Sequence, residues 1–213
     1  TALSNAIMRA QRQSRFSGSV VQWLSTRGRG DWSRIGAYYE DNMRFVRSAK
    51  RIFTDKNLFN HRAIGIIKAS LPNARIIVVE RNPMDVGFGC FRQLFGGEGA
   101  KFSYRFDELA AMLASYHGLM AYWQSVTTGL IMSVKYEELV AEPTRLIEKI
   151  LGFCGLSVEE NCFKFHATER SVKTLSAAQV RQPVFQHGVD RWKKYASQLR
   201  PLMAEFERLG VEY

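Results

Sequence analysis

The stretch Ala74-Arg-Ile-Ile-Val-Val-Glu-Arg-Asn-Pro-Met-Asp85 decides the fold class of this chain. At its centre, Ile76 to Val79 form an unbroken run of β-branched residues without polar alternation. Such a run is typical of a strand that is buried on both faces, as in a parallel sheet. The sequence Arg81-Asn-Pro83 ends the strand, and we expect a helix to follow from Met84.

Two other segments on either side of this stretch are expected to be strands, namely Arg51 to Thr54 and Leu130 to Tyr136. Helical periodicity predicts helices over Ala2 to Gln11, Trp32 to Val46, Ala63 to Leu71, Asp107 to Val126, a segment beginning at Pro143, and Gln198 to Leu209. Strands that alternate with helices indicate an α/β fold with a mostly parallel sheet. The 213 residues are enough for one domain with a substantial core.

A polar or charged side chain lies at or just after the end of each predicted strand: Lys56, Arg81 and Tyr136. Ligands of such sheets bind beyond the carboxyl ends of the strands. A lysine there can meet a phosphoryl or sulfuryl oxygen, and the planar fork of an arginine matches a terminal phosphate, with the amides of the following helix as additional donors. A solvated lysine, an Arg81–Asp85 ion pair that closes the turn, and a tyrosine that only packs are the alternatives.

A polar segment near the C-terminus, Ser176 to Pro183, has neither helix nor strand periodicity. It precedes the basic sequence Asp190-Arg-Trp-Lys-Lys194. Hydroxyl, amide and guanidinium groups in such a loop can close over a nucleotide, and Arg191 can contact a phosphate. An aromatic residue among basic ones also suits single-stranded nucleic acid. The remaining alternative is a solvated helix start with Trp192 docked in the core.

The composition is that of an ordered globular domain, with 46% hydrophobic and 23% charged residues. The net charge of +10 favours an anionic partner without choosing among nucleic acid, a phosphorylated cofactor, an acidic substrate and a membrane surface. Three cysteines without metal-ligand spacing predict reduced thiols, no metal site and a cytoplasmic location. No apolar run is long enough to predict a membrane span.

Several short motifs occur in an order that resembles the sulfotransferase family. The set is specific although each motif alone is weak: Thr54-Asp-Lys56, Pro72-Asn-Ala-Arg-Ile-Ile77, Arg81-Asn-Pro-Met-Asp85, Gln93-Leu-Phe95, Tyr136-Glu-Glu-Leu-Val140, Gly152-Phe-Cys-Gly-Leu156, Ser176-Ala-Ala-Gln-Val-Arg-Gln-Pro183 and Arg191-Trp192. The chain resembles bacterial sulfotransferases that are often attached to tetratricopeptide repeats and, more distantly, tyrosylprotein sulfotransferases.

The resemblance implies a three-layer α/β/α fold with a mostly parallel sheet, related to P-loop nucleotide kinases. It implies a sulfuryl donor, 3′-phosphoadenosine 5′-phosphosulfate (PAPS), an unidentified hydroxyl or amine acceptor, and no metal. Nucleic acid is then not an expected partner, whereas an N-terminal tetratricopeptide region is. Lys56 corresponds to the lysine that contacts the transferred sulfuryl group, and Arg81 to the arginine that binds the 3′-phosphate. The other implied donor-binding positions are Gly89, Tyr136, Ser176, Gln179, Val180, Arg181, Gln182 and Arg191.

The chain departs from the family pattern in three places. The Pro-Lys/Arg-Ser-Gly-Thr-Thr loop that binds the phosphosulfate, with its strand, would precede Thr1, so residues 1–213 are expected to be one N-terminally incomplete domain with little activity. The glutamate base of the tyrosylprotein relatives is also missing. Gly89 replaces a serine that binds the 3′-phosphate, and losing that hydrogen bond costs about 1.5–3 kcal/mol. A non-catalytic nucleotide- or protein-binding member and a basic nucleic-acid-binding domain are the alternatives.

Overall fold

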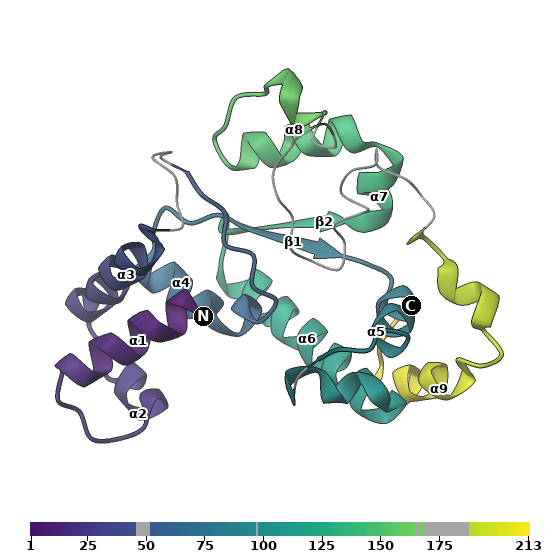
Figure 1. Ribbon diagram of the computed structural model, residues 1–213, viewed down its shortest axis with the longest axis horizontal. Coiled ribbons are helices and arrows are strands. Elements are labelled where there is room, and N and C mark those ends of the chain that lie inside the picture. Colours follow the sequence, from purple (N-terminus) through teal and green to yellow (C-terminus); the bar gives the residue numbers. More distant parts are fainter. Residues whose placement is uncertain (46–51, 97, 165–166, 168–187) are drawn as a thin grey trace. The chain divides into compact units, whose positions relative to one another are not determined.

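The computed structural model describes residues 1–45, 52–96, 98–164, 167 and 188–213 (Figure 1). The chain divides into two compact units. The first comprises residues 1–74 and 122–130, and the second comprises residues 75–121 and 131–213. Each unit is described by itself.

The regular elements of the first unit, over its described residues, are all helices. Its elements are α1 (Ala2–Gln13), α2 (Val20–Ser25), α3 (Arg29–Met43), the 3₁₀ helix η1 (Asn60–Ala63), α4 (Ile64–Ser70) and the last turn of α6. Side chains at the helix starts satisfy backbone groups: the Thr1 hydroxyl accepts from the Ser4 amide at α1, and Ser19 and Gln22 form a capping box at α2. The helices predicted for this region are confirmed, with ends shifted by a few residues.

Two helix contacts organise the first unit. α1 packs on α3 through a buried core to which Ala6, Ala10 and Ile35 contribute. α3 approaches α4 closely at Gly36, where an added Cβ would lie 2.1 Å from the Ser70 carbonyl oxygen. A glycine is therefore required at that position for the two backbones to come this close.

The prediction of a strand over Arg51 to Thr54 is wrong for residues 52–54, which are irregular. Ile52 is 56% exposed, and Phe53 stacks on Tyr39 of α3 with 6.2 Å between ring centroids. A strand needs a hydrogen-bonded neighbour, and a run of apolar residues in the sequence does not supply one. The aromatic contact to a helix gives Phe53 an alternative site of packing.

The second unit contains a small parallel sheet. β1 (Ile76–Glu80) pairs with β2 (Ile131–Lys135) in a register that joins Ile76 to Ile131 and Glu80 to Lys135 (Figure 1). Its helices are α5 (Pro83–Phe91), η2 (Glu98–Tyr104), α6 (Phe106–Val126), α7 (Tyr136–Ala141), α8 (Pro143–Phe153), η3 (Glu160–Cys162), η7 (Arg191–Tyr195) and α9 (Arg200–Leu209). This mixture of helices with a parallel strand pair agrees with the predicted α/β class.

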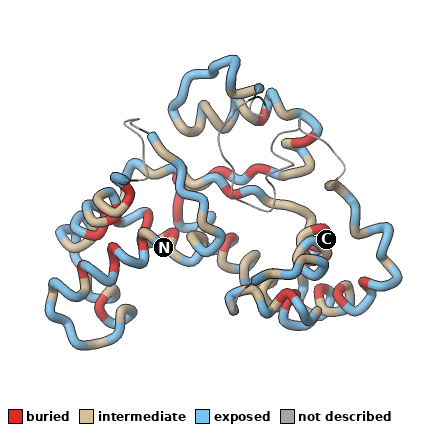
Figure 2. The backbone as a smooth tube through the Cα atoms, viewed as in Figure 1, coloured by how far each residue is buried: buried red, intermediate tan, exposed pale blue. Residues whose placement is uncertain are grey.

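Two buried hydrophobic clusters hold the second unit together, and their segments appear as red stretches in Figure 2. One joins α5, α6 and α9, and its fully buried members include Met84, Leu109 and Phe206. The other joins β2 to α8 and consists of Met132, Val134 and Leu146. Together they fix the strand ends and the start of α5, where the candidate site lies.

The expectation that β1 is buried on both faces is wrong. Val78 is buried, but Ile77 and Val79 are 39% and 53% exposed. Burial of a strand depends on what covers each face, which a β-branched run does not specify. Across the described ranges, no helix combines the length and the apolar character that crossing a membrane requires.

Candidate functional site

Arg81 and Tyr136 lie together at the carboxyl edge of the sheet. Arg81 follows β1 directly, and Tyr136 follows β2 directly as the first residue of α7. Because the two strands are parallel and in register, both residues reach the same edge. The Arg81 guanidinium carbon lies 4.7 Å from the centre of the Tyr136 ring, which is a cation–π contact. The sequence predicted this proximity.

The Arg81 guanidinium is held by two further groups. Its Nη2 donates to the Gly188 carbonyl oxygen and lies 3.7 Å from the Asp85 carboxylate. The Arg81–Asp85 ion pair that was one of the sequence alternatives is thus present. The side chain remains 29% exposed, and its buried Nε has no hydrogen-bond partner among the described residues. Arg81 is therefore oriented by its neighbours, while part of its guanidinium remains accessible.

Asp85 is buried at the start of α5 and accepts two backbone hydrogen bonds. The amides of Asp190 and Trp192 donate to it at 2.8 and 3.2 Å. These donors come from a segment more than one hundred positions further along the chain. The sequence showed Asp85 only as a partner for Arg81, and no local pattern indicated its distant partners.

The amides at the start of α5 are already satisfied. The Asn82 side chain accepts from the amides of Met84 and Asp85 at 2.9 and 3.3 Å, and Pro83 has no amide hydrogen. The expectation that this helix offers free amides to a phosphate is therefore wrong. The Asn82 amide itself donates to Glu137 of α7 at 3.0 Å, which links the ends of the two strands.

Gly188 is the point of closest approach between the C-terminal segment and this edge. An added Cβ there would lie 2.9 Å from the Tyr136 hydroxyl and 3.5 Å from Arg81 Nη2. A larger residue would displace the Tyr136 hydroxyl and would touch the guanidinium. The sequence analysis did not single out Gly188, because close approach to a distant residue leaves no local pattern.

The remaining donor-binding candidates of the second unit lie on surfaces. Gly89 is exposed on α5, and an added Cβ would meet no atom within 4 Å. Arg191 begins η7 and is exposed. Trp192 packs against the cluster of α5, α6 and α9, as the alternative for this segment predicted. Ser176, Gln179, Val180, Arg181 and Gln182 lie outside the described residues.

Lys56 belongs to the first unit, where a hydrogen bond to Tyr39 anchors the preceding residue, Asp55. The Tyr39 hydroxyl donates to the Asp55 carboxylate at 2.9 Å, while the Tyr39 ring stacks on Phe53. Burial, followed by the hydrogen bond to Asp55, raises the pKa of the Tyr39 phenol far above its ordinary value. Tyr39 thus holds the chain on both sides of Thr54 and limits where the exposed Lys56 can reach.

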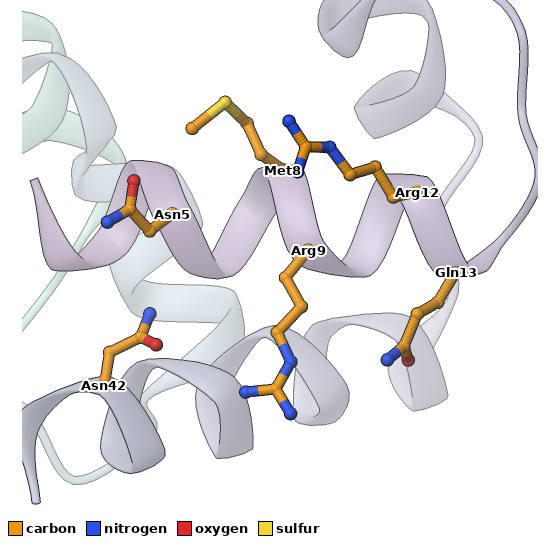
Figure 3. A pocket seen from close by; sticks show the side chains of 6 residues that line it. All are labelled: Asn5, Met8, Arg9, Arg12, Gln13 and Asn42. Carbon is orange, nitrogen blue, oxygen red and sulfur yellow. The ribbon is translucent and has the colours of Figure 1, made fainter.

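A groove of about 460 Å³ lies between α1 and α3 and is shown in Figure 3; it is lined by Asn5, Met8, Arg9, Arg12, Gln13 and Asn42. Most of its polar groups already join the two helices. Asn42 donates to the Ala2 carbonyl at 3.1 Å, Arg9 pairs with Asp41 at 2.7 Å, and Gln13 accepts from Tyr38. Across the described ranges no cluster of His, Cys, Asp and Glu could hold a metal ion. The strand-end residues therefore remain the candidate site.

Comparison with known proteins places the chain in a family. Residues 19–160 match a family described as "Sulfotransferase family", a range that includes Lys56, Arg81, Gly89 and Tyr136. A protein of Aquifex aeolicus (strain VF5), named "Uncharacterized protein", is 30% identical over 168 residues. The aligned part covers 78% of this chain and 22% of that protein, so the chain spans about a fifth of the relative's length.

Proposed function

Because this chain belongs to the sulfotransferase family, we propose that it transfers the sulfuryl group of PAPS to a hydroxyl or amine acceptor. The observation that carries the proposal is the arrangement around Arg81. A partly exposed guanidinium at the carboxyl edge of a parallel sheet has an aromatic ring beside it. The proposal includes the three-layer α/β/α architecture and, in the complete protein, a tetratricopeptide region.

Arg81 is assigned to the 3′-phosphate of the donor. Its planar fork can give two parallel hydrogen bonds to phosphate oxygens, and charge-assisted bonds of this kind are stronger than neutral ones. The Gly188 carbonyl accepts from Nη2 and helps to hold the guanidinium in one orientation. Tyr136 restrains the guanidinium from the side, so less side-chain entropy is lost when the phosphate binds.

Lys56 is assigned to the sulfuryl group. In an in-line transfer the acceptor oxygen or nitrogen forms a bond to sulfur, while the bond from sulfur to the bridging phosphate oxygen breaks. The acceptor loses its proton, and adenosine 3′,5′-bisphosphate leaves with the bridging electron pair. An ammonium group beside the bridging oxygen stabilises the charge that develops there. The Tyr39–Asp55 contact supports this role, because it restrains the segment that carries Lys56.

Gly89 favours a second candidate, a family member that binds the nucleotide without transferring sulfuryl groups. Family resemblance puts a phosphate-binding serine at this position, and this chain has only a hydrogen there. Weaker donor binding follows in either case, so binding and turnover need separate measurements.

Calorimetric titration of the intact protein with adenosine 3′,5′-bisphosphate tests the proposal. We expect saturable binding at one site, lost in Arg81→Ala and retained in Arg145→Ala. Arg145 is a matched control because it is an exposed arginine of the same unit that pairs with Glu142 at 2.6 Å. Salt-sensitive binding of any oligonucleotide, unaffected by Arg81→Ala, would instead support the nucleic-acid-binding alternative. Transfer of labelled sulfate from PAPS to an acceptor would separate the enzyme from the non-catalytic member.

A further inference from the structure

We infer that Asp85 is a positioning residue whose buried carboxylate fixes residues 188–192 at the sheet edge and thereby orients Arg81 toward the donor 3′-phosphate. This inference rests on the proposed function. It assigns a role to the contact between α5 and the C-terminal segment, which that function does not by itself require.

The environment of Asp85 is unusual for a carboxylate. Its side chain is 1% exposed, and a buried carboxylate is tolerated only when hydrogen bonds and charge satisfy it. Asp85 obtains its hydrogen bonds from the backbone of Asp190 and Trp192. Its charge partner is Arg81, 3.7 Å away. The Asp85 carboxylate therefore contacts both Arg81, which we propose binds the phosphate, and the backbone of the segment formed by residues 188–192.

The segment held by Asp85 contains a residue with a left-handed backbone. Asp190 has φ +59° and ψ +18°, a conformation that is uncommon outside glycine, although aspartate adopts it more often than most residues. The backbone amide of Asp190 donates to Asp85, and the side-chain carboxylate of Asp190 pairs with Lys193 at 2.7 Å. Such conformations persist only when the surroundings determine them, and they occur frequently at ligand-binding sites.

The segment of residues 188–192, called the turn below, determines which groups lie beside the Arg81 guanidinium. It brings the Gly188 carbonyl to Arg81 Nη2, and it brings the Gly188 backbone against Tyr136. Arg81 is thus oriented directly by Asp85 and indirectly through the turn that Asp85 holds. If the turn moved away, Arg81 would lose the Gly188 contact and would sample more rotamers.

A carboxylate suits this position better than an amide. The two backbone donors and the guanidinium all require acceptor oxygens, and Asp85 has two oxygens with several lone pairs. An asparagine would offer one oxygen and would direct its NH₂ group at another donor. Asp85→Asn should therefore loosen the turn while almost preserving the side-chain volume.

The test compares two ligands that differ only in the 3′-phosphate, adenosine 3′,5′-bisphosphate and adenosine 5′-monophosphate. In Asp85→Asn we expect the dissociation constant of the bisphosphate to rise about tenfold, the scale of one weakened charge-assisted hydrogen bond, with that of the monophosphate unchanged. A purely structural role would weaken binding of both ligands equally. Asp107→Asn removes an exposed carboxylate that pairs with Arg105 at 2.7 Å, and should change neither constant.

A second variant keeps the inference testable if Asp85→Asn does not fold. Gly188→Ala leaves the carboxylate intact but places a methyl group 2.9 Å from the Tyr136 hydroxyl and in contact with Arg81 Nη2. The Tyr136 side chain must then move from its place beside the guanidinium, so the variant should also reduce the preference for the bisphosphate. The inference is overturned if the wild type binds the bisphosphate and folded variants at both positions keep the wild-type preference. If the wild type does not prefer the bisphosphate to the monophosphate, the proposed function itself fails.

Discussion

At the scale of single residues, replacing Gly89 by serine should increase the affinity of the protein for the nucleotide. It is exposed on α5, and an added side chain would meet no atom within 4 Å. Under the proposed function, Gly89→Ser supplies the missing hydrogen bond to the 3′-phosphate. We expect affinity for adenosine 3′,5′-bisphosphate to rise at least about tenfold, since hydrogen bonds to charged groups contribute about 1.5–3 kcal/mol. Calorimetric titration measures this directly.

Gly118→Ser is the matched control for that prediction. Gly118 is also an exposed helical glycine without an atom near its virtual Cβ, but it lies on α6. Both serines should stabilise their helices slightly, because glycine is a poor helix former. Equal affinity changes in the two variants would show that helix stability, and not phosphate contact, accounts for the gain.

At the scale of elements, α6 carries a histidine that makes stability depend on pH. Burial lowers the pKa of His117 below its ordinary value of 6.5, and the charge of Glu80 offsets part of that effect. At a pH just below 6.5, His117 is therefore largely protonated in the unfolded chain but less so in the folded protein. The free energy of unfolding should fall as the pH drops below about 6.5. Above pH 7, His117 should cause little change of stability with pH.

The variant His117→Gln isolates that contribution. Urea unfolding at pH 7 and at pH 5.5 should show a smaller loss of stability in the variant than in the wild type. All other titrating groups are common to both proteins, so the difference between the two losses reports on His117. Identical losses would mean that His117 protonates as readily in the folded state as in the unfolded one.

At the scale of the whole molecule, the positive charge is concentrated in one region. Residues 1–74 hold 13 Lys and Arg against 4 Asp and Glu, a net charge of +9, whereas residues 75–213 hold 17 against 16, a net charge of +1. Anionic macromolecules should therefore bind chiefly to the first unit, with an affinity that falls as salt screens the charges.

Paired substitutions test this charge distribution. Arg12 and Arg29 are exposed, and Arg12→Gln with Arg29→Gln should lower the salt concentration that elutes the protein from a sulfated polysaccharide column. Lys149→Gln with Arg200→Gln removes two exposed charges from the second unit and should lower it less. Equal shifts for the two double variants would contradict the concentration of binding in the first unit.

The sequence by itself determined the features that depend on local pattern. The β-branched run before Arg-Asn-Pro predicted β1 and the helix after it, because strand propensity and a proline at the first helical turn act within a few residues. The 3.6-residue periodicity predicted α6 to within one residue of its ends. The order of short motifs indicated the family that residues 19–160 match.

Only the tertiary structure decided what depends on residues far apart in the chain. Residues 52–54 are irregular because Phe53 packs on a helix, and Ile77 and Val79 stay exposed although their run resembles a buried strand. The two amides that Asp85 binds and the close approach of Gly188 to Arg81 have no trace in local composition. A sequence pattern indicates the conformational preference of a local backbone segment. The partner of a buried charge depends on which distant segments the tertiary fold brings next to it.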